Sequence, residues 1–317
     1  MNSHPPKFHT TKNPKLTLVI VCYNMARELP RTLQSVSMGI HSGLTADQLE
    51  VIVVDNGSSI PVNLDACRRW IPDIQLVTIE HANQSPVNAI NKGLELANGE
   101  LVGVMVDGAR LLSPGLLIQA CNASTLHKRA VIGTFAFHLG PDVQMRSIAE
   151  GYDQEEEDRL LESCQWQSDG YRLFDISTLA GASSKGWFTV PNESNALFMH
   201  RDLWLELGGY DPEFITPGGG LCNHDMWFRA CSDSRNQVIL LLGEATFHQI
   251  HGGVETNAIV SKRELFRDEY TKIRGQSFRK PKIQPQLFGR FHPALLKSLD
   301  YSVQRAYQRV SRTHAVT

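Results

Sequence analysis

The sequence has no long hydrophobic run. Nowhere among its 317 residues do apolar side chains approach the roughly 18–20 in succession that a membrane-spanning helix needs. The first fifteen residues are polar, include two adjacent prolines and lack the apolar centre of a signal peptide. We therefore expect residues 1–14 to be a disordered segment and the protein to be cytoplasmic.

Cysteine is sparse and charge is nearly balanced. The six cysteines are scattered without a C-x-x-C pair, which favours reduced thiols over a disulfide framework or a zinc site. The net charge of −2 gives no sign of nucleic-acid binding. The length and the 42% hydrophobic content are those of an ordinary globular protein with a sizeable core.

The glycine-rich phosphate-binding motifs are missing as well. No G-x-G-x-x-G follows the first apolar run, which argues against a dinucleotide cofactor, and no G-x-x-x-x-G-K-[ST] is present. A nucleotidyltransferase would need a glycine-rich basic loop at the same point, and residues 21–27 contain no glycine. A diphosphate, if one is bound, must be held by other means, such as a hard divalent metal.

What the sequence does contain is an alternation of strand and helix patterns. Apolar runs predict strands over 16–22, 50–54, 75–79 and 101–106, and helical periodicity predicts helices over 28–38 and 86–97. The weaker second half predicts strands over 195–199 and 238–242 and helices over 201–207 and 223–231. We therefore predict an α/β fold with a sheet covered on both faces. The acidic stretch 150–162 is typical of a solvated helix start.

Two of the predicted strands end on an acid. The run 102–106 stops at Asp107, and the second strand is followed by Asp55. Because open α/β sheets bind ligands at the carboxyl ends of their strands, we expect both carboxylates at one ligand-binding edge.

The C-terminal segment 261–317 is basic, with thirteen Lys and Arg against four Asp and Glu. A final helix is predicted to begin at Pro293, and its apolar residues fall on one stripe: Leu295, Leu296, Leu299, Val303, Tyr307 and Val310. This stripe suits packing on the core or on a second subunit of a homo-oligomer, and peripheral contact with the inner membrane face is the alternative.

Several segments together resemble family 2 glycosyltransferases of the GT-A fold. The resemblance covers roughly residues 15–255 and is carried, in order, by 16–24, 51–58, 83–99, 106–109 and 195–214. It implies a Rossmann-like mixed sheet flanked by helices, with a helical C-terminal extension after a catalytic domain at 15–260. It also implies a nucleotide-diphosphate sugar as donor, Mn²⁺ or Mg²⁺ on the diphosphate, and attack by an acceptor hydroxyl, usually with inversion.

The resemblance also implies which residues bind the donor. The base and ribose are expected near Tyr23, Asn24 and Asp55. The full set of expected donor-binding residues is Cys22, Tyr23, Asn24, Asp55, Asn88, Asn91, Asp107 and Gly108.

The sequence departs from the family pattern at three places. Ala109 replaces the second acid of the Asp-x-Asp motif, Ile90 replaces the usual arginine before Asn91, and Cys222-Asn223 replaces a Glu-Asp pair. Since a late histidine is a metal ligand in several GT-A enzymes, we expect Asp107 to bind the metal with His248 or His251. Such a mixed ligand set suits Mn²⁺ better than Mg²⁺.

The general base is assigned to Asp225, the acid in the helix after the glycine loop, although a helix-start acid is the plainer interpretation. Arg110 is either a phosphate ligand or an ion-pair partner, and His224 lies on the acceptor side or at the surface. Asp211 reads as a turn residue, and Trp187 either packs in the core or stacks on a sugar.

The predicted function is transfer of a sugar from a nucleotide-diphosphate sugar to a glycan, a lipid-linked acceptor or a small hydroxyl compound. Cell-surface polysaccharide or glycoconjugate synthesis is the expected setting, by family habit alone. Because Ala109 and Asn223 depart from the family pattern, a catalytically decayed nucleotide-sugar-binding module is the alternative.

Overall fold

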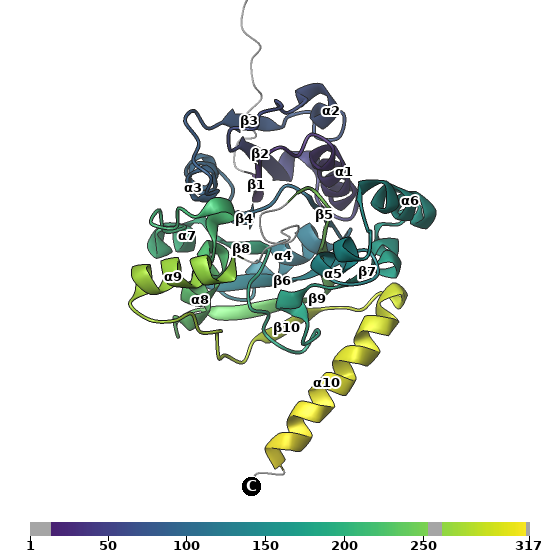
Figure 1. Ribbon diagram of the computed structural model, residues 1–317, viewed down its shortest axis with the longest axis vertical. Coiled ribbons are helices and arrows are strands. Elements are labelled where there is room, and N and C mark those ends of the chain that lie inside the picture. The colour runs from purple at the N-terminus through teal and green to yellow at the C-terminus, as the bar shows by residue number, and fades with distance from the viewer. Residues whose placement is uncertain (1–13, 253–261, 315–317) are drawn as a thin grey trace, which may run out of the picture.

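The structure is a computed structural model that describes residues 14–252 and 262–314, and Figure 1 shows its arrangement. One sheet runs through the molecule in the order β10-β9-β6-β8-β4-β1-β2-β3, with β5 paired to β9 and β7 to β6. The strands are β1 (Leu16–Cys22), β2 (Leu49–Asp55), β3 (Gln75–Thr78), β4 (Leu101–Met105), β5 (Arg110–Leu112), β6 (Ala130–Leu139), β7 (Ser177–Leu179), β8 (Ala196–His200), β9 (Gln237–His248) and β10 (Gln286–Gly289).

Helices cover both faces of this sheet. The α-helices are α1 (Glu28–His41), α2 (Leu64–Arg68), α3 (Val87–Leu96), α4 (Leu116–Ser124), α5 (Gln144–Ala149), α6 (Gln154–Cys164), α7 (Arg201–Leu207), α8 (Cys222–Ser232), α9 (Arg263–Arg274) and α10 (Leu296–His314). Short 3-10 turns are η1 (Ala46–Gln48), η2 (Gly170–Ile176), η3 (Gly181–Ser183), η4 (Pro217–Gly219) and η5 (Pro293–Leu295).

Strand β1 shows why the sheet is buried on both sides. Its side chains alternate in direction, so that Leu18 and Ile20 belong to the core cluster that includes residues of α1, α2 and α4, while Val19 and Val21 belong to the cluster that includes residues of α3, α7 and α8. Gly93 allows α3 to lie close against β1, because a Cβ built at this position would lie 2.2 Å from a Val19 methyl carbon. The continuous apolar sequence of β1 is therefore the sequence of a strand with two covered faces.

Strand β8 is antiparallel to both of its neighbours, β4 and β6, whereas the other neighbouring pairs on the main path are parallel. The carboxyl ends of β1, β2, β4, β6 and β9 therefore lie at one edge of the sheet, together with the amino end of β8. This mixed α/β sheet confirms the expected fold class. That edge is where the candidate site forms.

The predicted elements of the first hundred residues are present with bounds shifted by a few residues at most. The second half needs corrections. The last predicted strand, 238–242, is longer and runs to His248, so this histidine ends a strand and does not follow it. Strands β5, β6, β7 and β10 were not predicted. The acidic stretch 150–162 is not purely a solvated surface, since the Glu157 side chain on α6 is fully buried.

The C-terminal segment is partly integrated into the fold. Strand β10 adds to the sheet beside β9, so residue 260 is no boundary of the sheet. Helix α10 projects from the body of the molecule (Figure 1) and is anchored through Ser298 and Ser302, which bond the side chain and backbone of Trp187. Most of its predicted apolar stripe is exposed, and this holds for Leu296, Val303, Tyr307 and Val310.

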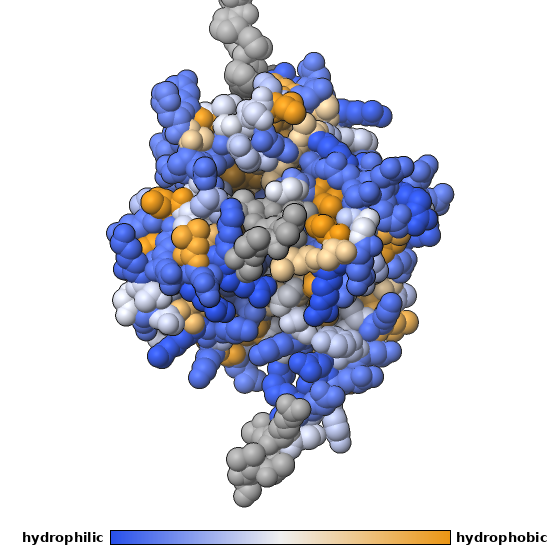
Figure 2. Space-filling view, viewed as in Figure 1, coloured by the Kyte–Doolittle hydropathy of each residue, from blue (hydrophilic) through white to orange (hydrophobic). Residues whose placement is uncertain are grey.

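Two surface and core properties complete the description. Figure 2 shows a face that is mostly hydrophilic outside its grey atoms, with small separate hydrophobic patches. Within residues 14–252 and 262–314, no helix has the length and apolar content needed to cross a bilayer. All six cysteines are free and buried, and burial raises the pKa of Cys67 and of Cys121 to about 11.

Candidate functional site

The β1 and β2 ends form one hydrogen-bonded loop pair. Asp55 is buried, and its carboxylate accepts bonds from the Ser58 N–H at 2.9 Å and the Ser58 hydroxyl at 2.6 Å. Asn24 has a left-handed backbone, and its side-chain oxygen accepts the Ser59 N–H at 2.8 Å. The sequence therefore correctly places Asn24 and Asp55 at one edge, where their two loops are bonded together.

Two further predicted donor-binding residues flank this loop pair. Cys22 is buried at the end of β1, beside Asp55 in the strand register, and its pKa is raised mainly by burial and also by the Asp55 charge. The Tyr23 side chain is 53% exposed, so its ring is free to face a ligand at this edge.

The two α3 residues predicted to bind the donor, Asn88 and Asn91, have different surroundings. Both polar atoms of the Asn91 amide bond the backbone of Tyr210, at 2.7 and 2.9 Å. Asn91 thereby ties α3 to the segment after α7. Asn88 lies exposed on the same helix. The structure thus gives Asn91 a structural role, and donor binding by this residue stays a prediction.

Asp107 stands in a tight turn directly after β4. Its Oδ1 accepts the N–H of Ala109 at 2.9 Å, and the N–H of Gly108 donates to the Val21 carbonyl at 2.7 Å. A Cβ at Gly108 would lie 3.1 Å from that carbonyl oxygen, so glycine suits this close approach. The turn leaves Oδ2 of Asp107 facing the end of β9.

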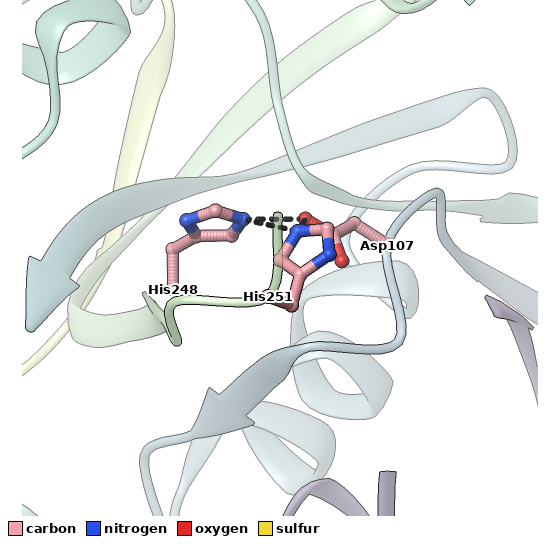
Figure 3. Close-up of side chains that lie close together, drawn as sticks. All are labelled: Asp107, His248 and His251. Carbon is pink, nitrogen blue, oxygen red and sulfur yellow. Dashed lines mark hydrogen bonds and ion pairs between the residues drawn. The ribbon is translucent and has the colours of Figure 1, made fainter. Parts of the chain in front are cut away.

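Two histidines meet that oxygen. The Nε2 atoms of His248 and His251 lie 2.7 and 3.5 Å from Oδ2 of Asp107, and 3.1 Å from each other. Figure 3 shows the two rings and the carboxylate directed at one another. The three ligand atoms lie within 4.8 Å of one another, in the pattern of a metal site. The structure therefore brings together the three residues that the sequence assigned to the metal.

The hydrogen bonds of His248 test whether a cation fits. The amide nitrogen of Gln144 donates to the His248 carbonyl at 3.0 Å, which leaves the amide oxygen 2.5 Å from Nδ1. An amide oxygen only accepts, so Nδ1 carries the proton of a neutral ring and Nε2 presents its lone pair to Asp107. Two acceptors 2.7 Å apart require a proton or a metal ion between them. The donor set fits a divalent cation with mixed nitrogen and oxygen ligands.

The electrostatics of the three groups agree with this assignment. Burial, supported by the charge of Arg110, lowers the pKa of His248 to about 4, so the ring is neutral at pH 7. Burial works to raise the pKa of Asp107, but its interactions with His251 and His248 hold that pKa well below its ordinary range. His251 has a raised pKa, because Asp107 outweighs the effect of burial. Asp107 is thus an anionic ligand at neutral pH.

Arg110 supplies a buried positive charge beside this cluster. It lies on β5 opposite His248, and its Nε is 3.5 Å from Oδ2 of Asp107. Among the residues that the structure describes, its Nε and Nη1 atoms have no hydrogen-bond partner. Burial lowers its pKa, while the charges of Asp107 and Glu193 raise it. A buried guanidinium with unused donors is suited to binding a phosphate.

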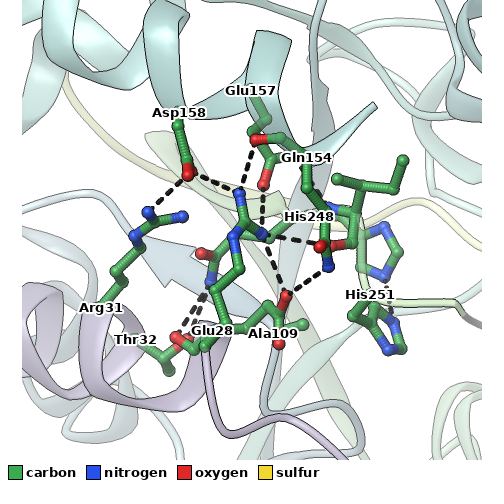
Figure 4. Close-up of polar contacts among 12 residues, drawn as sticks. Glu28, Arg31, Thr32, Ala109, Gln154, Glu157, Asp158, His248 and His251 are labelled. Carbon is green, nitrogen blue, oxygen red and sulfur yellow. Dashed lines mark hydrogen bonds and ion pairs between the residues drawn. The ribbon is translucent and has the colours of Figure 1, made fainter. Parts of the chain in front are cut away.

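A second polar cluster holds the loop between the two histidines. The N–H of Ile250 donates to Glu157 at 2.8 Å, and the guanidinium of Arg27 contacts Glu157, Glu28 and the Ile250 carbonyl. Figure 4 shows this network, with Glu157 and Asp158 of α6 facing α1 close to the histidines. Helix α6 therefore acts as a support for the loop that carries His251.

Asp225, the predicted general base, is buried and forms ion pairs within the protein. Its side chain is 1% exposed, and its two oxygens bond Arg229 at 2.8 Å and Arg274 at 2.7 Å twice. Both oxygens of this carboxylate are therefore already bonded to guanidinium groups of the protein, away from solvent. Arg274 also pairs with Asp211, whose carboxylate accepts the N–H of Glu213, as a turn residue does.

Trp187 and His224, for which the sequence left alternatives open, are placed as follows. Trp187 is fully buried and packs on Phe135 and Phe137, so it belongs to the core. His224 is mostly buried, with its Nδ1 3.5 Å from Glu193. Sequence reasoning missed Glu193, Gln144 and Glu157. The usable signal for Glu193 was an acid directly before the strand 195–199.

A model of glycosyl transferase family 2 matches residues 17–176, half of the chain. The chain belongs to this family. No curated protein sequence matches it significantly. The matched segment of this family 2 glycosyltransferase contains Asp55 and Asp107, whereas the two histidines lie beyond it.

Solved structures agree in fold at low sequence identity. Staphylococcus aureus TarS residues 1–349, in complex with UDP-GlcNAc, has a TM-score of 0.53 and 14% identity, over 82% of this chain and 65% of TarS. GalNAc-T7 with UDP, GalNAc and Mn²⁺ has a TM-score of 0.51 and 15% identity, over 76% of this chain and 44% of that one. The mannosyltransferase PcManGT from Pyrobaculum calidifontis, with GDP-Man and Mn²⁺, has a TM-score of 0.50 and 16% identity, over 97% and 77%.

These likenesses show the GT-A fold of this family 2 glycosyltransferase. The chain spans 65% of TarS 1–349 in its UDP-GlcNAc complex and 42% of a longer TarS structure, so it covers only part of these proteins.

Proposed function

We propose that this chain transfers a sugar from a nucleoside diphosphate sugar to a hydroxyl acceptor, with inversion at the sugar carbon. The observation that carries the proposal is the convergence of Asp107, His248 and His251 at the ligand-binding edge of a family 2 glycosyltransferase. The structural neighbours with bound nucleotide sugars or Mn²⁺ support the same class of donor. The catalytic domain is proposed to begin near residue 15.

In the proposed reaction, an acceptor oxygen forms a bond to the anomeric carbon as the bond from that carbon to the diphosphate breaks. Negative charge then builds on the leaving diphosphate, and the unused donors of Arg110 are placed to meet it. Asp107, His248 and His251 would hold a divalent ion, preferably Mn²⁺, which supplies Lewis-acid stabilisation of the same charge. Asp55 and Asn24 are proposed to position the nucleoside.

A thermal-shift titration tests this proposal. UDP, GDP, CDP and dTDP are each added with and without Mn²⁺, and a ligand at 100 times its Kd stabilises by about 2.7 kcal/mol. One nucleotide should raise the Tm only with Mn²⁺, and Asp107→Ala should abolish the rise. The exposed Asp47→Ala is the matched control. No response to any nucleotide diphosphate would count against the function.

Two substitutions favour a second candidate, a nucleotide-sugar-binding module without transfer activity. Ala109 and Asn223 stand where the family has acids. Such a module would bind a nucleotide with Mn²⁺ but release no nucleoside diphosphate from any sugar donor. We also propose that the acceptor is a glycan, a lipid-linked compound or a small hydroxyl compound, and that the reaction belongs to cell-surface polysaccharide or glycoconjugate synthesis. Helix α10 is proposed to contact a membrane or a second copy of the chain.

A further inference from the structure

The loop before the antiparallel strand β8 contains a carboxylate, that of Glu193, at the edge of the sheet where the candidate site lies. Met105 at the end of β4 is paired with Ala196 at the start of β8. Asp107 comes two residues after the first, and Glu193 three residues before the second. Because β8 runs antiparallel to β4, the loop before β8, which carries Glu193, lies at the same edge of the sheet as Asp107.

Glu193 is held by the residue that replaces the family acid. The amide nitrogen of Asn223 donates to the Glu193 carboxylate at 2.8 Å and to the Ser194 carbonyl at 3.2 Å. The amide oxygen of Asn223 accepts the Tyr210 hydroxyl at 3.0 Å. An amide is not a proton acceptor at neutral pH, so Asn223 orients a carboxylate and does not act as the base itself.

The surroundings of Glu193 differ from those of Asp225 on the same side of the sheet. The Glu193 side chain is 21% exposed, and among the described residues no arginine forms an ion pair with it. His224 lies 3.5 Å away, too far for a hydrogen bond, and its Nδ1 is buried without a partner. Glu193 is thus a carboxylate that is oriented and partly open to solvent.

Glu193 also interacts electrostatically with Arg110, the buried cation beside the proposed metal ligands. Arg110, which contacts Asp107, is acted on electrostatically by Glu193 as well. One buried guanidinium therefore interacts electrostatically with both a proposed metal ligand and this carboxylate.

We propose that Glu193 is the general base of the transfer, in place of the family acid at position 223. The inference rests on the proposed function. As the acceptor oxygen bonds the anomeric carbon, its proton passes to the Glu193 carboxylate, and the electron pair of the breaking bond leaves with the nucleoside diphosphate. Glu193 then returns the proton to solvent, to which its side chain is open.

The test uses the full chain and a panel of donors. UDP-glucose, UDP-galactose, UDP-GlcNAc, GDP-mannose and dTDP-glucose are incubated with Mn²⁺ in water containing glycerol as a simple hydroxyl acceptor, and released nucleoside diphosphate is measured. Glu193→Gln should lower the release rate by about 100-fold or more, the usual range for a lost general base. Glu193→Asp should keep a measurable fraction of the wild-type rate. Glu162→Gln, an exposed change on α6, should have no effect.

Binding separates this inference from the proposed function. The Tm rise caused by nucleoside diphosphate with Mn²⁺ should be the same in wild type and in Glu193→Gln, which also shows that the variant is folded. Equal release rates in these two proteins, including no release from either, would overturn the role of Glu193. A wild type that binds no nucleotide with Mn²⁺ would overturn the proposed function itself.

Discussion

The backbone N–H of Ile250 donates a 2.8 Å hydrogen bond to the carboxylate of Glu157, and this bond joins helix α6 to the segment between His248 and His251. The bonded oxygen comes from a fully buried side chain that also contacts Arg27. One buried acid on α6 thus helps to fix the position of a proposed metal ligand.

Glu157 should make stability depend on pH. Burial raises its pKa from 4.5 to about 7, against the opposing contacts with Ile250 and Arg27. Its stabilising effect is therefore complete below pH 4.5 and is lost as pH rises through 7. From pH 4.5 to pH 8, wild type should lose about 3 kcal/mol relative to Glu157→Gln in urea unfolding. Parallel stability curves for the two proteins would contradict this prediction.

Gln144 should control metal affinity without touching the metal. Its amide oxygen fixes the tautomer of His248. Loss of a hydrogen-bond partner of a metal-binding histidine typically weakens metal binding by about 10- to 100-fold. Gln144→Leu should show this loss in a Mn²⁺ titration followed by electron paramagnetic resonance. Gln304→Leu, an exposed change on α10, is the control. Unchanged Mn²⁺ affinity in Gln144→Leu would show that the tautomer is set elsewhere.

Gly93→Ala should destabilise the protein although alanine is the better helix former. The new Cβ would lie 2.2 Å from a Val19 methyl carbon, so α3 or β1 must shift. Overpacking of this kind costs about 1–3 kcal/mol in urea unfolding. Val19→Ala in the same chain should recover part of the loss. The control is Gly181→Ala, where a Cβ meets nothing within 4 Å.

Arg274→Ala should expose the cost of a buried charge. It leaves the Asp225 carboxylate, 1% exposed, with Arg229 as its remaining ion-pair partner among the described residues. Breaking a buried pair in this way destabilises by about 3 kcal/mol. Adding Asp225→Asn should restore part of the stability, and the exposed Arg279→Ala should be neutral. Additive losses in the double variant would mean that the two residues are not coupled.

The first hundred residues could be predicted from sequence because each strand there is a continuous apolar run with a clear helix after it. β5, β7 and β10 have only three or four residues, too few for a periodicity to be recognised. The apolar run of β6 cannot be distinguished from a buried helix by periodicity alone.

The candidate site also contains residues that could be predicted from the sequence and residues that could not. Asp107 follows a strong strand pattern, and the two histidines stand at and just after the end of a second strand, so their meeting could be predicted. Glu157 stands among four other acids at 153–158, and only its burial and its bond to the Ile250 N–H, which are tertiary properties, distinguish it. Glu193 matters because β8 is reversed, and strand direction is a tertiary property that a five-residue run does not reveal.

The six buried thiols also make the protein a suitable host for site-specific labels. Burial raises the thiol pKa of Cys67 and Cys121 to about 11, so few thiolates are present at pH 7 and maleimide reagents should react slowly. A single cysteine placed at exposed Gln304 on the projecting helix would carry a fluorophore without background. The wild-type cysteines could then stay in place while partners of that helix are sought by energy transfer.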